Sequence, residues 1–233
     1  MRLDKFLANM GYGSRKDVKA IVKKKRITVN NQIIRKADIH IDPSQDQIKC
    51  DGKIIEYKEY IYLMLHKPAE YLSATEDQKQ KTVLDLIKKQ DKVLEPFPVG
   101  RLDKDTEGLL LLTNDGQLAH ELLSPKKHVD KTYIAKLARD ITEQEINQFA
   151  EGVLLEDGYL TKPAKLRAIE DKMVEITITE GKFHQIKRMF EAVNNNVLYL
   201  KRLSMGSLYL DEKLKMGEYR ELTKEELDQL SSK

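Results

Sequence analysis

The first candidate for chemistry is a cluster of charged side chains near the middle of the sequence. In FPVGRLDKDTEGLLLLTNDG, residues 97–116, Asp103 and Asp105 follow Arg101 and precede an apolar run. Paired carboxylates can act on a glycosidic bond, and loops held by rigid strands often carry function. Residues two apart on an extended chain share one side of it, however, so they do not face each other across a bond. On pattern alone, a charged surface turn is the better explanation.

Most other catalytic motifs are absent. The sequence contains no HExxH, GxSxG or GxxxxGK[ST], and GYGSRK lacks the third glycine of a dinucleotide-binding loop. Ser124 begins an SxxK match without its companion elements, which we interpret as chance. Cys50 is the only cysteine, which excludes an internal disulfide, a zinc knuckle and an iron–sulfur site. We therefore expect neither a metal nor a cofactor.

The elements that must position the charged cluster follow from hydrophobic periodicity after residue 60. We predict strands in IYLMLHKP, YLSAT, GLLLLTN, KTYIAKL, KPAKLRAI, KMVEITITEG and VLYLKRL. We predict a helical turn in TVLDLI and helices in GQLAHELLS, TEQEINQFAEGV, KFHQIKRMFEAV and TKEELDQL, the last with a capping box of Thr223 and Glu226. The order of these strands and helices along the chain predicts an α+β fold on a mainly antiparallel mixed sheet with flanking helices.

The first 59 residues have a different character. They carry 14 basic and 8 acidic side chains, a net charge of +6, whereas the other 174 residues carry 27 and 30, a net charge of −3. Apolar residues at helical spacing from Leu3, a Ser14 cap and a turn at Asn30-Asn31 predict a helix, a second helix and a hairpin. We expect a small domain at residues 1–59 and a larger one at residues 60–233.

The basic charge of the small domain indicates a polyanionic partner. Residues 1–36 hold 11 basic and 2 acidic side chains, and such a density favours nucleic acid or anionic lipid. A solvated helix face is the alternative, but a helix that only needs solubility usually mixes charge signs. No run approaches the roughly 18 apolar residues of a membrane span, and the N-terminus does not resemble a secretory signal. We expect a cytoplasmic protein that does not engage a membrane.

The basic segment also resembles a known domain. RLDKFLA, followed by SRKDVKAIVKKKRITVN, is similar to the alpha-L (S4-like) RNA-binding domain shared with a small-subunit ribosomal protein. In that domain the second helix and the following loop contact folded RNA. The resemblance implies RNA contacts from Arg2, Ser14, Arg15, Lys16, Lys19, Lys25 and Arg26.

The larger part resembles the pseudouridine synthases. GRLDKDTEGLLLLTNDG resembles their defining motif, and LHKP at 65–68, KTY at 131–133 and EGKFHQIKRMFE at 180–191 match further elements in the family's order. LTKPA at 160–164, GEYRELT at 217–223 and the basic N-terminal domain resemble the RsuA subgroup, whose members act on small-subunit rRNA. The resemblance implies an isomerase that converts one uridine of 16S rRNA, by this likeness uridine 516, to pseudouridine.

The resemblance also implies the catalytic residues. Asp103 matches the family's aspartate and would be the nucleophile, attacking the sugar or assisting elimination. Tyr133 would stack on the uracil and could assist proton transfer from C5. Lys187 would place its own positive charge near Asp103, since desolvation alone would favour a neutral carboxyl at Asp103. Arg188 is the alternative partner.

Two further residues are candidates for substrate binding, together with Arg188. Arg101 matches the family position whose side chain enters the stack that the flipped uridine vacates, and a phosphate contact is its alternative role. His184 lies in the motif at 180–191 and is given no catalytic role.

Three other functions stay open at this point. The chain could be a ribosome-associated rRNA-binding module without catalysis, a synthase acting on large-subunit rRNA, or a hydrolase that releases free uracil. The expected partner is small-subunit rRNA or an assembly intermediate of that subunit, bound by a monomer. Analysis of the product separates an isomerase, a hydrolase and a binding module.

Overall fold

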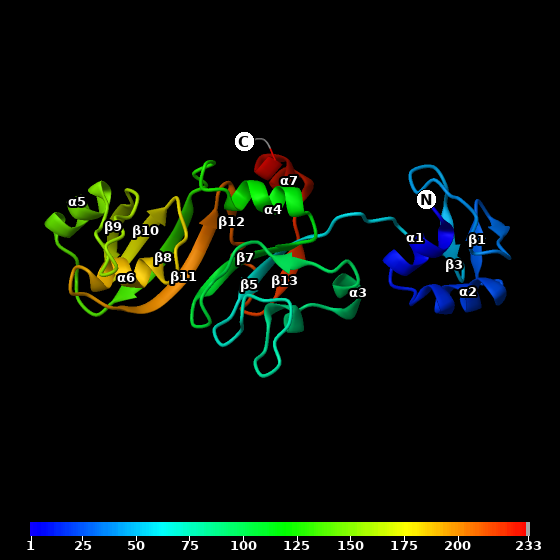
Figure 1. The fold of residues 1–233 in the computed structure, drawn as a ribbon, viewed down its shortest axis with the longest axis horizontal. Helices are drawn as coiled ribbons and strands as arrows, with labels where there is room; N and C mark the ends of the chain where they lie inside the picture. Colours follow the sequence, from blue (N-terminus) through cyan, green and yellow to red (C-terminus); the bar gives the residue numbers. More distant parts are fainter. Residues whose placement is uncertain (232–233) are drawn as a thin grey trace. The chain divides into compact units, whose positions relative to one another are not determined.

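The computed structural model describes residues 1–231 of the chain (Figure 1). Contacts divide these residues into two compact units. The first contains Met1–Ile61 and Lys88–Pro96, and the second contains Tyr62–Ile87 and the described residues from Phe97 onward. The short helix α3 (Lys89–Lys92) lies in the second segment of the first unit. Among the described helices, none has the length and apolar character that crossing a membrane requires.

The first unit packs two helices on a four-stranded sheet of order β2-β1-β3-β4. Its elements are α1 (Leu3–Asn9), α2 (Arg15–Lys23), β1 (Ile27–Val29), β2 (Gln32–Ile33), β3 (Ile48–Cys50) and β4 (Lys53–Ile54). The predicted Ser14 cap is present, because Ser14 and Asp17 exchange the two hydrogen bonds of a capping box. Asn30 and Asn31 have φ angles of 51° and 66° and form the predicted hairpin turn. The strands β3 and β4 were not predicted, because they are too short to show a pattern.

The second unit is built on a nine-stranded sheet over the described residues, in which β7 and β11 are parallel and the other pairs are antiparallel. Its main path is β13-β5-β7-β11-β8-β10-β9. The strands are β5 (Tyr62–Lys67), β6 (Phe97–Pro98), β7 (Glu107–Thr113), β8 (Lys131–Leu137), β9 (Lys165–Glu170), β10 (Met173–Ile178), β11 (Val197–Met205), β12 (Leu208–Tyr209) and β13 (Tyr219–Glu221). The predicted α+β class with a mainly antiparallel mixed sheet is confirmed.

Helices cover this sheet at several places (Figure 1). They are the 3-10 helix η1 (Val83–Leu86) and the α-helices α4 (Gly116–Leu123), α5 (Glu143–Glu151), α6 (Gln185–Glu191) and α7 (Lys224–Ser231). Leu109 and Leu111 of β7 share one buried cluster with Leu118 of α4 and Leu230 of α7, and Figure 1 shows these two helices side by side. The helix α6 packs on β11.

One predicted strand is wrong. YLSAT at residues 71–75 forms no strand, and Leu72 makes only an isolated bridge to Thr82. The Ser73 hydroxyl instead donates to the Leu102 carbonyl at 2.8 Å and accepts from the Leu102 N–H at 3.0 Å. The segment therefore braces the loop before β7, a tertiary role that alternation of residue types does not reveal.

The sheet topology brings three distant segments together. Arg202 of β11 lies opposite both Gly108 of β7 and Tyr133 of β8. A β carbon on Gly108 would come within 2.2 Å of the Arg202 carbonyl oxygen, so the parallel strands can approach only because this residue is glycine. The loop that precedes β7, the middle of β8 and the helix before β11 therefore meet at one place.

Candidate active site

The loop from Arg101 to Thr106 is held by a buried lysine. Lys67 ends β5, is 0% exposed, and donates from Nζ to the carbonyl oxygens of Asp103 at 3.2 Å and Thr106 at 2.8 Å. Its Nζ also donates to Pro68 at 3.0 Å and Lys104 at 3.3 Å. The Thr106 N–H donates to the Asp103 carbonyl at 3.0 Å and closes the turn. Burial lowers the pKa of Lys67 to about 8.

A pocket opens beside this loop. Its lining includes Arg101, Asp103 and Thr106 from the loop and Tyr133 from β8. The Asp103 side chain is 27% exposed, and Tyr133 is buried. The remaining lining residues come chiefly from the α6 region and are Gly181, Lys182, His184, Gln185, Ile186 and Lys187, with Leu102, Ile178 and Leu200. The pocket therefore brings a carboxylate and an aromatic ring together at one place.

Lys187 lies between two carboxylates. Its Nζ donates to Asp105 Oδ1 at 2.7 Å and Oδ2 at 2.8 Å, and lies 3.5 Å from Asp103 Oδ2. Partial burial of Asp105 acts to raise its pKa, but the hydrogen bonds and charge of Lys187 outweigh this and hold the pKa below its usual value. His184 Nε2 lies 3.6 Å from Asp103 Oδ1. Asp103 is therefore flanked by an ammonium group and an imidazole.

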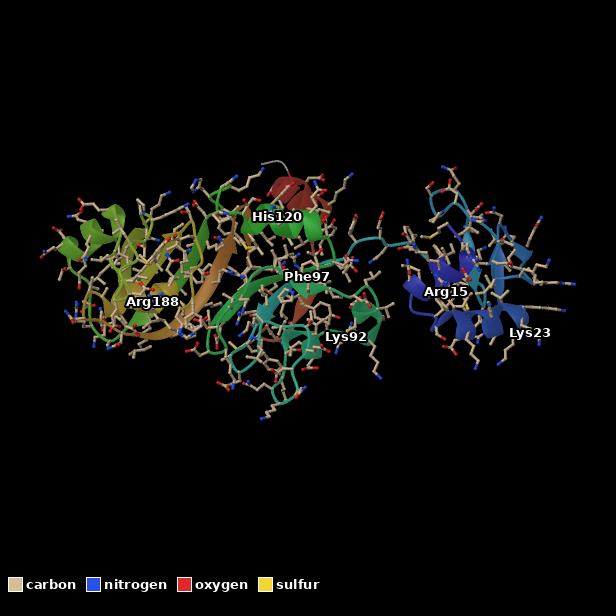
Figure 2. The ribbon with its side chains drawn as sticks, viewed as in Figure 1. Arg15, Lys23, Lys92, Phe97, His120 and Arg188 are labelled. Atoms are coloured by element: carbon tan, nitrogen blue, oxygen red, sulfur yellow. The ribbon has the colours of Figure 1, made fainter. Side chains whose placement is uncertain are left out.

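Arg188, the alternative partner, pairs with a different carboxylate. Its Nη2 lies 2.5 Å from Asp157 Oδ2, and this contact lowers the pKa of Asp157. Figure 2 labels Arg188 on α6. Of the six predicted catalytic and substrate-binding residues, the structure brings together Arg101, Asp103, Tyr133, His184 and Lys187 around the pocket and leaves Arg188 beside Asp157.

Sequence reasoning missed two polar residues of this site. Lys67 does carry a sequence signal, because a lysine at the end of an apolar strand must be paired if it is buried. Thr106 lines the pocket, and its Oγ1 is buried without a hydrogen-bond partner among the described residues. That hydroxyl can therefore form a hydrogen bond with a ligand in the pocket. No pattern in the sequence distinguishes Thr106 from any other loop threonine.

The predicted RNA-binding residues of the first unit fall into two groups. Arg15, Lys16, Lys19 and Lys25 are exposed, on α2 or just after it, and Figure 2 labels Arg15. The other three side chains have partners: Arg2 with the buried Asp4 at 2.7 Å, Arg26 with Asp51 at 2.5 Å, and Ser14 as the cap of α2. The exposed group is the one that can reach a phosphate without first breaking an ion pair.

No group of three or more His, Cys, Asp or Glu side chains in the described part of the chain could hold a metal ion.

Comparison with known proteins agrees with this geometry. Residues 61–192 match the family model described as RNA pseudouridylate synthase, and residues 1–48 match the S4 domain. The chain is 54% identical to the uncharacterized RNA pseudouridine synthase YtzG of Bacillus subtilis, over 99% of this chain and 98% of that protein. It is 40% identical to the ribosomal small subunit pseudouridine synthase A of Escherichia coli K12, over 97% and 98%.

A solved structure described as that of a pseudouridylate synthase is similar over nearly the whole chain. It superposes with a TM-score of 0.70 at 37% identity and covers 99% of each chain. The chain therefore belongs to the RNA pseudouridylate synthase family and carries an S4 domain before its synthase domain.

Proposed function

We propose that this pseudouridine synthase acts on a uridine of small-subunit ribosomal RNA, and specifically on uridine 516 of 16S rRNA. The relatives named small-subunit synthase A, which match 97% of the chain, support the class of RNA. The S4 domain supports an RNA partner. We further propose that residues 1–59 form the RNA-binding domain, residues 60–233 form the catalytic domain, and the enzyme works as a cytoplasmic monomer.

The arrangement that carries this proposal is Asp103 and Tyr133 facing one pocket, with Lys187 beside the carboxylate. The reaction breaks the C1′–N1 bond of uridine, turns the uracil within the pocket and joins C5 to C1′. The proton leaves C5, and N1 is protonated, so atoms and electrons balance without a co-reactant. Asp103 would supply the carboxylate, either by attack on C1′ or by removal of a sugar proton.

Lys187 would pair with that carboxylate. Its ammonium nitrogen lies 3.5 Å from Asp103 Oδ2 and attracts the carboxylate electrostatically. Asp105 shares the same ammonium group at 2.7 Å, so we propose that Asp105 fixes the position of Lys187 in the free enzyme. Tyr133 would lie against the uracil ring and assist proton transfer from C5.

The uridine must leave its stack to reach Asp103, at a cost of a few kcal/mol. Arg101 is exposed and lines the pocket, so its planar guanidinium could fill the vacated stack. His184 and the unpartnered Thr106 hydroxyl would contact the substrate. The exposed cations Arg15, Lys16, Lys19 and Lys25 would bind phosphates, with Arg2, Ser14 and Arg26 beside them.

The test is to incubate the enzyme with naked 16S rRNA and with partly assembled small subunits, and to map pseudouridine by carbodiimide-dependent primer-extension stops. We expect one new stop, at uridine 516, and no free uracil. Free uracil would indicate a hydrolase, and tight binding without any product would indicate a binding module. A new stop in 23S rRNA alone would assign the enzyme to the large subunit.

A further inference from the structure

Phe183 is an exposed aromatic side chain next in sequence to residues that line the pocket. It is 72% exposed, although phenylalanine is among the residues most often buried. Its chain neighbours Lys182 and His184 both line the pocket that contains Asp103. An exposed phenylalanine at this position lacks a structural reason within the described residues, since its ring contributes little to the core.

The turn that presents Phe183 is firmly held. The Gln185 N–H donates to the Lys182 carbonyl at 3.2 Å, which makes Lys182–Gln185 a β-turn with Phe183 at its tip. The Gln185 side chain, 3% exposed, accepts from the Lys182 N–H at 2.9 Å and donates to Glu180 at 2.7 Å. Glu180 also accepts from the Tyr159 hydroxyl at 2.7 Å. The turn that carries the exposed Phe183 ring is therefore held in place by hydrogen bonds.

The Phe183 ring stacks on His184, which lies near the Asp103 carboxylate. Phe183 and His184 have ring centroids 3.8 Å apart and planes within 19° of parallel. His184 Nε2 in turn lies 3.6 Å from Asp103 Oδ1. One face of Phe183 is covered by the imidazole, and its high exposure leaves area for a second planar group.

RNA would supply such a group where the target uridine is flipped. Removing one base from a stack leaves its neighbours with an uncovered face, and proteins commonly cover such bases with aromatic side chains. Lys182 and Arg101 provide positive charge around the same pocket, which suits an approaching phosphate backbone. An apolar protein partner is a poorer match here, because Lys182, His184 and Gln185, which adjoin Phe183 in the turn, are polar.

We propose that Phe183 is a stacking platform for the base of a nucleotide next to the flipped uridine. This inference rests on the proposed function, since it requires an RNA substrate in the Asp103 pocket. Stacking of one base on an aromatic ring corresponds to about 5- to 150-fold in affinity.

The test uses the full-length enzyme and an RNA fragment that carries the mapped target. Phe183→Ala should weaken binding about 5- to 150-fold. Phe183→Tyr should bind as the wild type does, and Phe183→Leu should not, because leucine keeps an apolar side chain but offers no ring. Tyr209→Ala is the matched control: Tyr209 is 69% exposed on β12 and does not line the pocket. It should bind as the wild type does.

A cycle with abasic RNA identifies the stacked base. The base on either side of the target is removed in turn, and binding is measured for the wild type and for Phe183→Ala. At one of the two positions, base removal should weaken the wild type but leave Phe183→Ala unchanged. Additive losses at both positions, or wild-type binding by Phe183→Leu, would overturn the inference. A wild-type enzyme that forms no pseudouridine would instead overturn the proposed function, which the activity assay shows separately.

Discussion

At the scale of single residues, the site depends on one ammonium group shared by two carboxylates. Lys187 lies 2.7 Å from Asp105 and 3.5 Å from Asp103, so it is bound more closely to the carboxylate that we do not assign as the nucleophile. This geometry suggests that Asp105 holds Lys187 in place while Asp103 stays accessible to a substrate.

Replacing Lys187 should therefore affect both carboxylates. Lys187→Met should reduce the single-turnover rate about 100-fold or more, while Lys187→Arg keeps the charge and should retain part of the activity. In Lys187→Met, the pKa of Asp105 should rise, because the hydrogen bonds and the charge of Lys187, which oppose the effect of desolvation, are lost. Carboxyl-carbon NMR titration measures this change.

Arg188→Met is the matched control on the same helix, since Arg188 pairs with Asp157. A larger loss of rate in Arg188→Met than in Lys187→Met would assign the partner role to Arg188. The sequence motif indicates both Lys187 and Arg188 as possible partners of Asp103, but it does not show which of them contacts the carboxylate. Neighbouring helical residues point about 100° apart, and the rotation of α6 on β11 decides which one faces Asp103.

At the scale of elements, the loop before β7 is positioned from the end of β5. Lys67→Met removes the three hydrogen bonds from Nζ to carbonyls of this loop, and a fourth to Pro68, so activity should fall even though Lys67 does not line the pocket. The variant should also unfold more easily. Urea unfolding and the single-turnover rate at saturating RNA measure the two effects.

The stability of the folded protein should depend on pH through Lys67. The pKa of Lys67 is about 8 in the folded protein and 10.5 as its ordinary value, so the unfolded chain binds more protons between these values. Stability from this group therefore rises with pH from about 8 to 10.5, by at most about 1.4 kcal/mol per pH unit. The rise should be absent in Lys67→Met. Parallel stability curves for the two proteins would contradict the burial of a charged Lys67.

The contact between the parallel strands β7 and β11 is a second element that can be tested. Gly108→Ala should destabilise the protein by at least about 2 kcal/mol, because the residue has a φ of 104° and its β carbon would meet the Arg202 carbonyl at 2.2 Å. Gly116→Ala is the control, since nothing lies within 4 Å of its β carbon. It should be neutral or slightly stabilising. Equal thermal stability of the two variants would show that the strands can separate at no cost.

Local patterns predicted most of these elements for identifiable reasons. The capping boxes of α2 and α7 combine a side chain and a backbone group three residues apart, so the sequence alone predicts them. The segment 71–75 was mistaken for a strand because its partner is the distant Leu102 backbone. The position of Thr106 beside Tyr133 depends on a parallel pairing between strands that are far apart in sequence, which periodicity cannot specify.

At the scale of the whole molecule, positive charge is concentrated before residue 60. The full-length variant with Arg15→Gln, Lys16→Gln and Lys19→Gln should bind rRNA more weakly. The slope of log affinity against log salt should decrease by about 0.7 to 0.9 for each phosphate that the variant no longer neutralises. A control with Lys165→Gln, Lys213→Gln and Lys224→Gln changes the net charge equally on exposed residues of the second unit. The same slope in both triple variants would show that α2 is not the electrostatic anchor.

The central claim is that the Asp103 carboxylate carries out the isomerisation in this pocket. The most direct measurement is single-turnover pseudouridine formation by Asp103→Asn on the mapped rRNA substrate, with binding measured on the same samples. Asparagine keeps the size of the side chain and removes the charge. We predict a loss of rate of about 10⁴-fold or more, with affinity within about threefold of the wild type. Pseudouridine formed at a rate near that of the wild type would contradict the account.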